Sequence, residues 1–177
     1  MKLGWVAGCL VVYTAFVIHR VIPQMPERIP TSFDWHGRPT ASSSPEALWG
    51  MLVAQALGTI LILAIPYVAR RAPQMVNLGW RKLSDFPPPH RQQVMPLIED
   101  MSGWMAVTFA LFLTLLVRAL VRAALEPGAS PSMWPLALFI AATVGIVVYY
   151  LYRVEQIWKR EVVPNLRPRA PQRGALD

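Results

Sequence analysis

The chain has 177 residues and a formal net charge of +7, from 17 Lys and Arg and 10 Asp and Glu. Charged residues make up 15% of it, compared with roughly 25% in soluble domains, and apolar residues make up 54%. This deficit of charge argues against a soluble fold. A nucleic-acid-binding protein would carry its cations along one exposed face, whereas here they collect in short segments beside apolar runs. The composition predicts a membrane protein with the lipid bilayer as partner and no nucleic acid.

Four apolar stretches are long enough to cross about 30 Å of hydrocarbon as helices of roughly 20 residues. None contains an acidic residue, and none shows the in-and-out alternation of barrel strands. Because a spanning segment must satisfy its own backbone hydrogen bonds in lipid, each should be a helix. The predicted fold class is an all-α integral membrane protein, a bundle of four transmembrane helices within residues 1–160. The predicted spans cover about residues 3–22, 47–69, 103–125 and 133–152.

The first stretch has an alternative interpretation, because the string from Val6 to Cys9 resembles a lipoprotein cleavage site. A signal peptide needs an apolar region of about 7 to 15 residues before its cleavage site. Only Leu3, Gly4 and Trp5 separate Lys2 from the site in question. The spanning helix is therefore the favoured interpretation, and the single cysteine offers no intramolecular disulfide.

The distribution of cations predicts the orientation of the bundle. Twelve Lys and Arg residues lie at the N-terminus, in the 70–102 connection and after residue 152, and five lie on the opposite side. Short loops rich in Lys and Arg stay in the cytoplasm, so both termini are predicted to be cytoplasmic and the 23–46 loop extracytoplasmic. The basic, Pro-rich segment 161–177 is predicted to be disordered and attracted to anionic lipid.

The 23–46 loop is the most distinctive part of the chain. Four prolines between residues 23 and 39 fix φ and remove backbone donors, which disfavours a regular helix and a central strand. An ordered, turn-rich loop is expected, with a turn at Gly37. The small polar residues 41–44 are expected to form a flexible approach to the second span. Three aromatic residues are candidates for headgroup depth: Phe33, Trp35 and Trp49.

The string MPERIPTSFDWHGRP at residues 25–39 lies between two predicted spans. It resembles the signature of the bacterial membrane family called domain of unknown function 1648, roughly LP-x-x-[IV]-P-T-H-F-x-x-x-G-x-P-D. That domain also stands at the N-terminus of SdpI-type immunity and signalling proteins. The resemblance extends over about residues 25–70, with Met25 in place of Leu. The matching residues are Pro26, Ile29, Pro30, Thr31, Phe33, Gly37 and Pro39.

Two positions depart from the family pattern. Ser32 stands where the family has His, and Thr40 stands where it has Asp. If the family binds a cation or a partner through those side chains, this chain has lost them, and Asp34 and His36 are nearby substitutes. The resemblance implies a small multi-pass protein of the bacterial cytoplasmic membrane with no established activity.

Few side chains are candidates for catalysis or for binding a metal or cofactor. The sequence has no zinc-ligand spacing, no Gly-rich phosphate loop and no Gly-x-Ser-x-Gly elbow. The predicted topology also separates His90 from His19 and His36. No catalytic residue, metal site or cofactor is therefore predicted. Asp34 and His36 with Glu27 would form either a weak outer cation site or a loop-stabilising polar cluster, and the second is favoured.

Arg118 and Arg122 are the clear charges inside a predicted span, and such charges are functional candidates. They are four residues apart and share a helix face, with Glu126 one turn further. Their side chains would either snorkel to the outer headgroups or pair with a carboxylate such as Asp34; snorkelling is the simpler interpretation. The candidate binding residues are Asp34, His36, Arg38, Arg118 and Arg122.

Three further patterns concern packing. Gln55 in the second span predicts an interhelical hydrogen bond. Three pairs of small residues four apart predict close helix approach in a bundle or a homo-oligomer: Gly4 and Gly8, Ala54 and Gly58, and Ala141 and Gly145. After the helix-breaking prolines 87–89, apolar residues recur at helical spacing between 94 and 101. That stripe predicts an amphipathic lead-in along the inner leaflet or, as the sharper alternative, a partner-docking helix.

Three functions from different classes follow from these patterns. The favoured one is a non-enzymatic immunity, sensing or signalling module whose 23–46 loop meets a peptide or envelope ligand, or which contacts a cytoplasmic regulator. The alternative is a small transporter component or membrane-complex subunit, although the sequence shows no broken helix pair and no acidic residue at the midplane. A membrane enzyme lacks a clustered nucleophile or metal set.

Overall fold

The computed structural model describes residues 2–34, 39–126 and 134–163, and four long helices dominate it. Each helix is long and apolar enough to cross a membrane, which confirms the predicted helical fold with four helices of spanning length. Of the segment 161–177, which is predicted to be disordered, residues 164–177 lie outside the described residues. The helices are α1 (Lys2–Val21), α2 (Ala47–Arg71), α3 (Pro88–Leu125) and α4 (Trp134–Ile157).

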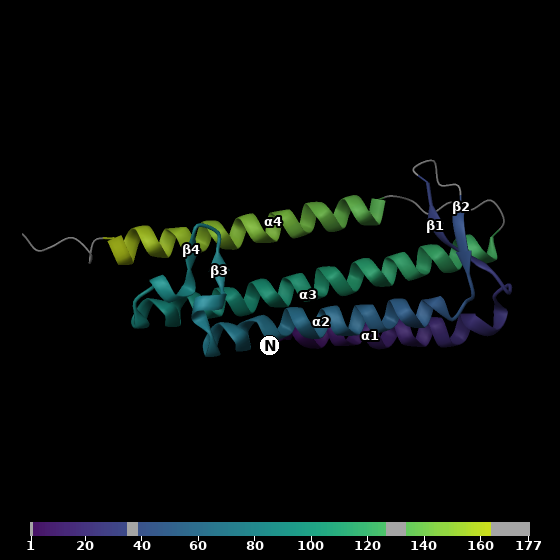
Figure 1. Ribbon diagram of the computed structural model, residues 1–177, viewed down its shortest axis with the longest axis horizontal. Helices are drawn as coiled ribbons and strands as arrows, with labels where there is room; N and C mark the ends of the chain where they lie inside the picture. The colour runs from purple at the N-terminus through teal and green to yellow at the C-terminus, as the bar shows by residue number, and fades with distance from the viewer. Residues whose placement is uncertain (1, 35–38, 127–133, 164–177) are drawn as a thin grey trace, which may run out of the picture.

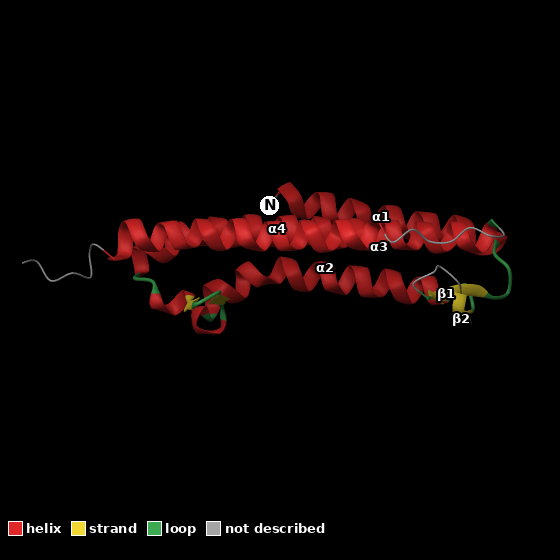
Figure 2. Cartoon of the chain, turned by 90° about the horizontal axis from the view of Figure 1, so that it is seen from above, coloured by secondary structure: helices red, strands yellow, loops and turns green. Residues whose placement is uncertain are grey.

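The helices run up and down along one axis, so the start of α1 and the end of α4 face the same end of the molecule (Figure 1). Two small hairpins occupy opposite ends. The β1–β2 end carries strands β1 (Ile29–Phe33) and β2 (Pro39–Ser43), and the β3–β4 end carries β3 (Asn77–Leu78) and β4 (Arg81–Lys82). Helix α3 packs against α1, α2 and α4 (Figure 2).

Helix α3 is longer than the predicted third span. Its 38 residues correspond to roughly 57 Å at 1.5 Å per residue, and the hydrocarbon core is about 30 Å thick. The helix begins at Pro88 instead of near residue 103, so the prolines start it and do not break it. Proline fits the first helical turn because the N–H groups there have no intrahelical partner.

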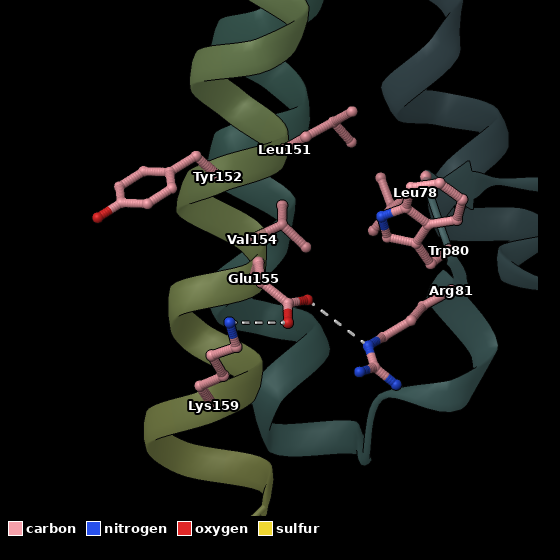
Figure 3. A pocket seen from close by; sticks show the side chains of 9 residues that line it. Leu78, Trp80, Arg81, Leu151, Tyr152, Val154, Glu155 and Lys159 are labelled. Carbon is pink, nitrogen blue, oxygen red and sulfur yellow. Dashed lines mark ion pairs between the residues drawn. The ribbon is translucent and has the colours of Figure 1, made fainter.

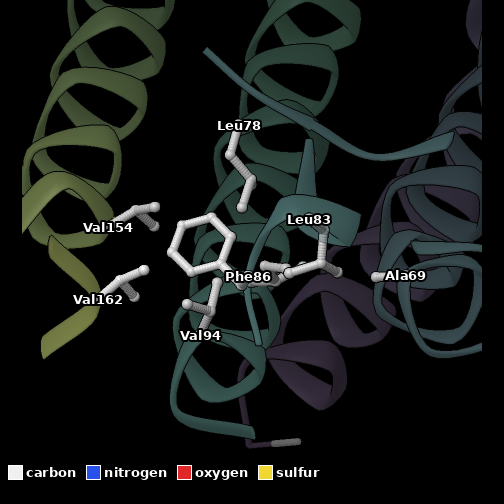
Figure 4. Close-up of a cluster of buried hydrophobic side chains, with 8 residues drawn as sticks. Ala69, Leu78, Leu83, Phe86, Val94, Val154 and Val162 are labelled. Atoms are coloured by element: carbon white, nitrogen blue, oxygen red, sulfur yellow. The ribbon is translucent and has the colours of Figure 1, made fainter. Parts of the chain in front are cut away.

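The first turns of α3 are covered by the chain itself. Val94 and Ile98 are buried in a cluster with Phe86, from the preceding loop, and Val154, from α4 (Figure 4). The predicted lead-in along the leaflet is therefore wrong: the amphipathic stripe faces protein. Short 3₁₀ helices flank the β3–β4 hairpin at Pro73–Met75 and Leu83–Asp85, and another follows α1 at Ile22–Gln24. A π-helical turn, Trp158–Val162, follows α4.

The β3–β4 hairpin turns through Gly79 and Trp80. Leu78 pairs with Arg81, so two residues form the turn, and Gly79 has a φ of +73° while no other described residue has a positive φ. A two-residue turn with positive φ at its first central position alone is type II′, which glycine adopts without steric cost.

The segment at the other end is also a hairpin. Ile29 pairs with Ser43 and Phe33 with Pro39, with irregular register between them. Residues 41–43 are thus paired in β2, and the expected flexible approach to α2 is wrong there. Prolines are compatible with this sheet because both strands of a two-stranded ribbon are edge strands. A proline there can turn its missing backbone N–H toward the unpaired edge.

Exposed aromatic side chains mark two levels along the bundle. Trp49 and Tyr67 on α2 are 18 residues apart, as are Trp134 and Tyr152 on α4, and all four are exposed. Eighteen residues of helix span roughly 27 Å, close to the thickness of the hydrocarbon core. Because Trp and Tyr are enriched at the two membrane interfaces, this spacing is consistent with a multi-pass membrane protein.

Candidate functional site

The β1–β2 hairpin is seated on the bundle by two apolar side chains. Ile29 is fully buried in a cluster with Ile18 of α1, Leu48 of α2 and Val117 of α3. Phe33 is half-buried and packs against the same cluster, and its proposed place at headgroup depth remains a prediction. Two of the residues that match the family signature therefore dock the hairpin onto three helices at once.

The opposite side of the hairpin is polar and open. All five residues of β2 are exposed, and the Thr31 and Ser43 hydroxyls lie 3.3 Å apart across the strands. Ser32 and Thr40, which depart from the family pattern, are both exposed. At the entry to α2, hydrogen bonds from the Ser44 side chain and its own backbone N–H lower the pKa of Glu46.

The predicted binding residues divide into three groups. Asp34 follows β1 and is half-buried, whereas His36 and Arg38, with Trp35 and Gly37, lie outside the described residues. Arg118 and Arg122 are exposed on the face of α3 near its end. A single binding site formed by these residues remains a prediction.

The two arginines have contacts on the helices themselves. Arg118 Nη1 donates to Tyr13 Oη of α1 at 3.4 Å, and Arg122 Nε donates to Glu126 Oε2 at 2.8 Å. The second pair is the i, i+4 arrangement that the sequence places on one face. Exposed guanidinium groups near a helix end fit the snorkelling interpretation. A pairing of either arginine with Asp34 remains a prediction.

A buried polar layer joins three helices below the hairpin. Gln55 Nε2 of α2 donates to the Ala110 carbonyl at 2.8 Å and to Thr114 Oγ1 at 3.1 Å on α3, which confirms the predicted interhelical hydrogen bond. Thr114 Oγ1 lies 2.8 Å from Thr14 Oγ1 of α1. Sequence reasoning missed both threonines, which carry no local signal because they are 100 residues apart.

This layer is incompletely satisfied. Gln55 Oε1 and Thr59 Oγ1 are buried and have no hydrogen-bond partner among the described residues, and the same holds for Ser102 Oγ further along α3. Buried polar groups in proteins are nearly always hydrogen-bonded. The interior of α1, α2 and α3 therefore contains acceptors and hydroxyls that can exchange partners if the helices shift.

The β3–β4 end is tied together by polar contacts that the sequence did not reveal. Arg91 donates to the carbonyls of Ser84 at 2.9 Å and Phe86 at 2.8 Å, and the Lys82 amide donates to Asp85 Oδ2 at 2.9 Å. Arg70 of α2 pairs with Glu99 of α3. One sequence signal could have indicated this hairpin. Gly79 occupies the first central position of the two-residue turn, where a type II′ turn favours glycine.

No group of three or more His, Cys, Asp or Glu residues within 2–34, 39–126 and 134–163 could hold a metal ion. No protein-family model matches the chain, and no curated protein or solved structure matches it. The resemblance to the domain of unknown function 1648 family remains a prediction from residues 25–70.

Proposed function

We propose that the chain is a non-enzymatic, multi-pass sensing or immunity module of a bacterial cytoplasmic membrane. In this proposal the β1–β2 hairpin meets an extracytoplasmic peptide, and α3 transmits the consequence to the β3–β4 end in the cytoplasm. The observation that carries the proposal is the position of α3, which supplies Val117 and Leu120 to the cluster under the first hairpin and Val94 and Ile98 to the cluster under the second.

The hairpin could bind a peptide and pass on the effect of binding to the helices beneath it. A two-stranded ribbon has unpaired backbone groups along its outer edges, and an extended peptide can add to such an edge as a further strand. The hairpin cannot move freely in response, because Ile29 is enclosed by α1, α2 and α3. Packed interiors change between discrete arrangements and do not deform continuously, so lifting Ile29 would alter how three helices meet.

The path along α3 contains an element that can have two arrangements. Val117 and Ile98 are 19 residues apart, roughly 28 Å along the helix. Between them lies Thr114, which shares its hydroxyl with Thr14 and Gln55, beside the unpartnered Oε1 of Gln55. A small rotation of α3 could exchange these hydrogen bonds at little cost in free energy, since Gln55 Oε1 can accept a hydrogen bond in the new arrangement.

Coupling between the two ends can be measured by hydrogen exchange with mass spectrometry in lipid nanodiscs. Ile29→Ala should accelerate amide exchange in the hairpin at 29–43 and also in the region 76–86 at the far end. Leu138→Ala is the matched control, because Leu138 is an exposed apolar residue of α4. Faster exchange confined to residues 29–43 in Ile29→Ala would contradict the proposed transmission.

The second candidate function, a small transporter component, is favoured by a different observation. Gln55 Oε1, Thr59 Oγ1 and Ser102 Oγ lie inside the bundle without a hydrogen-bond partner in the described part of the chain, and buried polar groups in membrane proteins often mark a solute path. Solute flux into liposomes containing the purified protein, abolished in Gln55→Leu, would support this candidate. Solute flux equal to that of protein-free liposomes would exclude the transporter candidate and leave the sensing module as the proposed function.

A further inference from the structure

A pocket of about 350 Å³ lies between the β3–β4 hairpin and the end of α4. Its apolar part consists of Leu78 from the hairpin and Leu151 and Val154 from α4. Trp80 stands at the hairpin tip, and Tyr152 of α4 also borders the pocket, although its ring points away from the hairpin (Figure 3). The pocket therefore combines a hydrocarbon-like surface with one indole at its edge.

Charged side chains form the rest of the lining. Arg81 Nε lies 3.7 Å from Glu155 Oε2, and Lys159 Nζ lies 3.5 Å from Glu155 Oε1 (Figure 3). Two cations thus share one carboxylate at distances that are long for charge-assisted hydrogen bonds. The set has one excess positive charge, and neither cation is fully neutralised.

Arg81 is held in place, and its Nε makes an ion pair but no hydrogen bond with a described residue. Its guanidinium carbon lies 4.0 Å from the centre of the Trp158 ring, so stacking fixes the plane of the group. Arg81 Nε is buried and has no hydrogen-bond partner among the described residues. Because the Glu155 carboxylate is 3.7 Å away, beyond hydrogen-bond distance, the Arg81 side chain can still donate to an anion, and the planar fork of arginine matches phosphate oxygens.

The pocket lies at the level where lipid headgroups are expected. On α4, Trp134 and Tyr152 mark the two aromatic levels, and the lining residues of that helix extend from Leu151 to Lys159. Trp80 is 98% exposed. An indole so placed is unfavourable in bulk water and favourable at headgroup depth, which puts the hairpin tip in the interface.

We propose that this pocket binds an anionic glycerophospholipid from the adjacent leaflet, the inner leaflet under the predicted orientation. The phosphate contacts Arg81 and Lys159, and the first part of an acyl chain lies on Leu78, Leu151 and Val154. An anionic headgroup is preferred to a choline headgroup because the excess charge is positive and no second carboxylate lines the pocket to receive the ammonium. The proposal rests on this pocket and is independent of the proposed sensing function.

The test uses the full chain purified in detergent, with bound lipid counted by native mass spectrometry during titration with phosphatidylglycerol or phosphatidylcholine. Wild type should retain phosphatidylglycerol selectively. Removing both cations in Arg81→Gln/Lys159→Gln should weaken its affinity by about a hundredfold, since each charge-assisted hydrogen bond contributes about a factor of ten. Lys82→Gln is the matched control: Lys82 neighbours Arg81 on β4 and does not line the pocket.

A gain-of-affinity variant separates binding from folding. Glu155→Gln removes the competing carboxylate and keeps its shape, so it should bind phosphatidylglycerol more tightly than wild type, a result that misfolding does not mimic. Weaker binding by Glu155→Gln would overturn the proposal. Equal losses in Lys82→Gln and the double variant, or equal retention of both lipids, would do the same. Displacement of the lipid by millimolar inorganic phosphate would show an anion site that does not recognise lipid, which also overturns it.

Discussion

The contact between α2 and α3 at Gly58 gives a quantitative prediction. A Cβ atom placed on Gly58 would lie 2.4 Å from Phe109 Cε1 and 2.7 Å from Phe109 Cζ, whereas one placed on Gly8 or Gly145 would meet nothing within 4 Å. Gly58→Ala therefore forces the Phe109 ring or the helix itself to move. Overpacking of this kind costs about 1 to 3 kcal/mol, whereas Gly8→Ala and Gly145→Ala should be neutral or slightly stabilising, because alanine favours the helix.

The assay is the free energy of unfolding in mixed micelles, followed by circular dichroism, for the three glycine variants and a rescue variant. Phe109→Leu shortens the side chain that Gly58 contacts, so Gly58→Ala/Phe109→Leu should be more stable than the sum of the single changes predicts. Equal stability of Gly58→Ala and Gly8→Ala would refute the packing, and strict additivity in the double variant would show that Phe109 is not the neighbour.

Three other predictions concern the hairpin, the polar layer and the arginines. Trypsin added to intact vesicles should cut after Arg28 slowly in wild type and much faster in Ile29→Ala, because truncating a fully buried Ile costs about 2 to 5 kcal/mol; equal rates would show that Ile29 does not hold the hairpin. Gln55→Leu should lower the free energy of unfolding by about 0.6 to 2 kcal/mol, the range for membrane hydrogen bonds, and a more stable variant would mean that its unpartnered Oε1 outweighs the two bonds. In a double-mutant cycle of Asp34→Asn with Arg118→Gln, a coupling of about 0.5 kcal/mol or more would establish contact, and additivity would leave Arg118 as a snorkelling side chain.

The sequence predicts the four helices because an apolar segment of roughly 20 residues is long enough to cross hydrocarbon and must hydrogen-bond its own backbone there. It predicts the Gln55 hydrogen bond for a related reason: a buried amide in a span must find a partner. It does not predict where α3 begins, because Val94 and Ile98 form an apolar stripe whether lipid or protein covers it. Pattern alone identifies an apolar face and not the surface that it meets.

The hairpins were missed for two different reasons. In β1–β2, Pro30 and Pro39 argue against a central strand, yet a ribbon made only of edge strands tolerates them. In β3–β4, each strand has two residues, too few for any alternation to register. The pocket beside Trp80 depends on the end of α4 reaching that hairpin, more than 70 residues away along the chain, and no local pattern reports such a contact.

The opposite placement of the two hairpins is the central claim, since the extracytoplasmic position of the β1–β2 ribbon and the inner-leaflet position of the lipid pocket both depend on it. Single cysteines at Ser43, in exposed β2, and at Ser84, beside β4, can be compared in a Cys9→Ala background. The thiol at position 43 should react with a membrane-impermeant maleimide in intact cells, and the thiol at position 84 only after lysis. Labelling of position 84 in intact cells, or labelling of both positions from the same side, would contradict the arrangement.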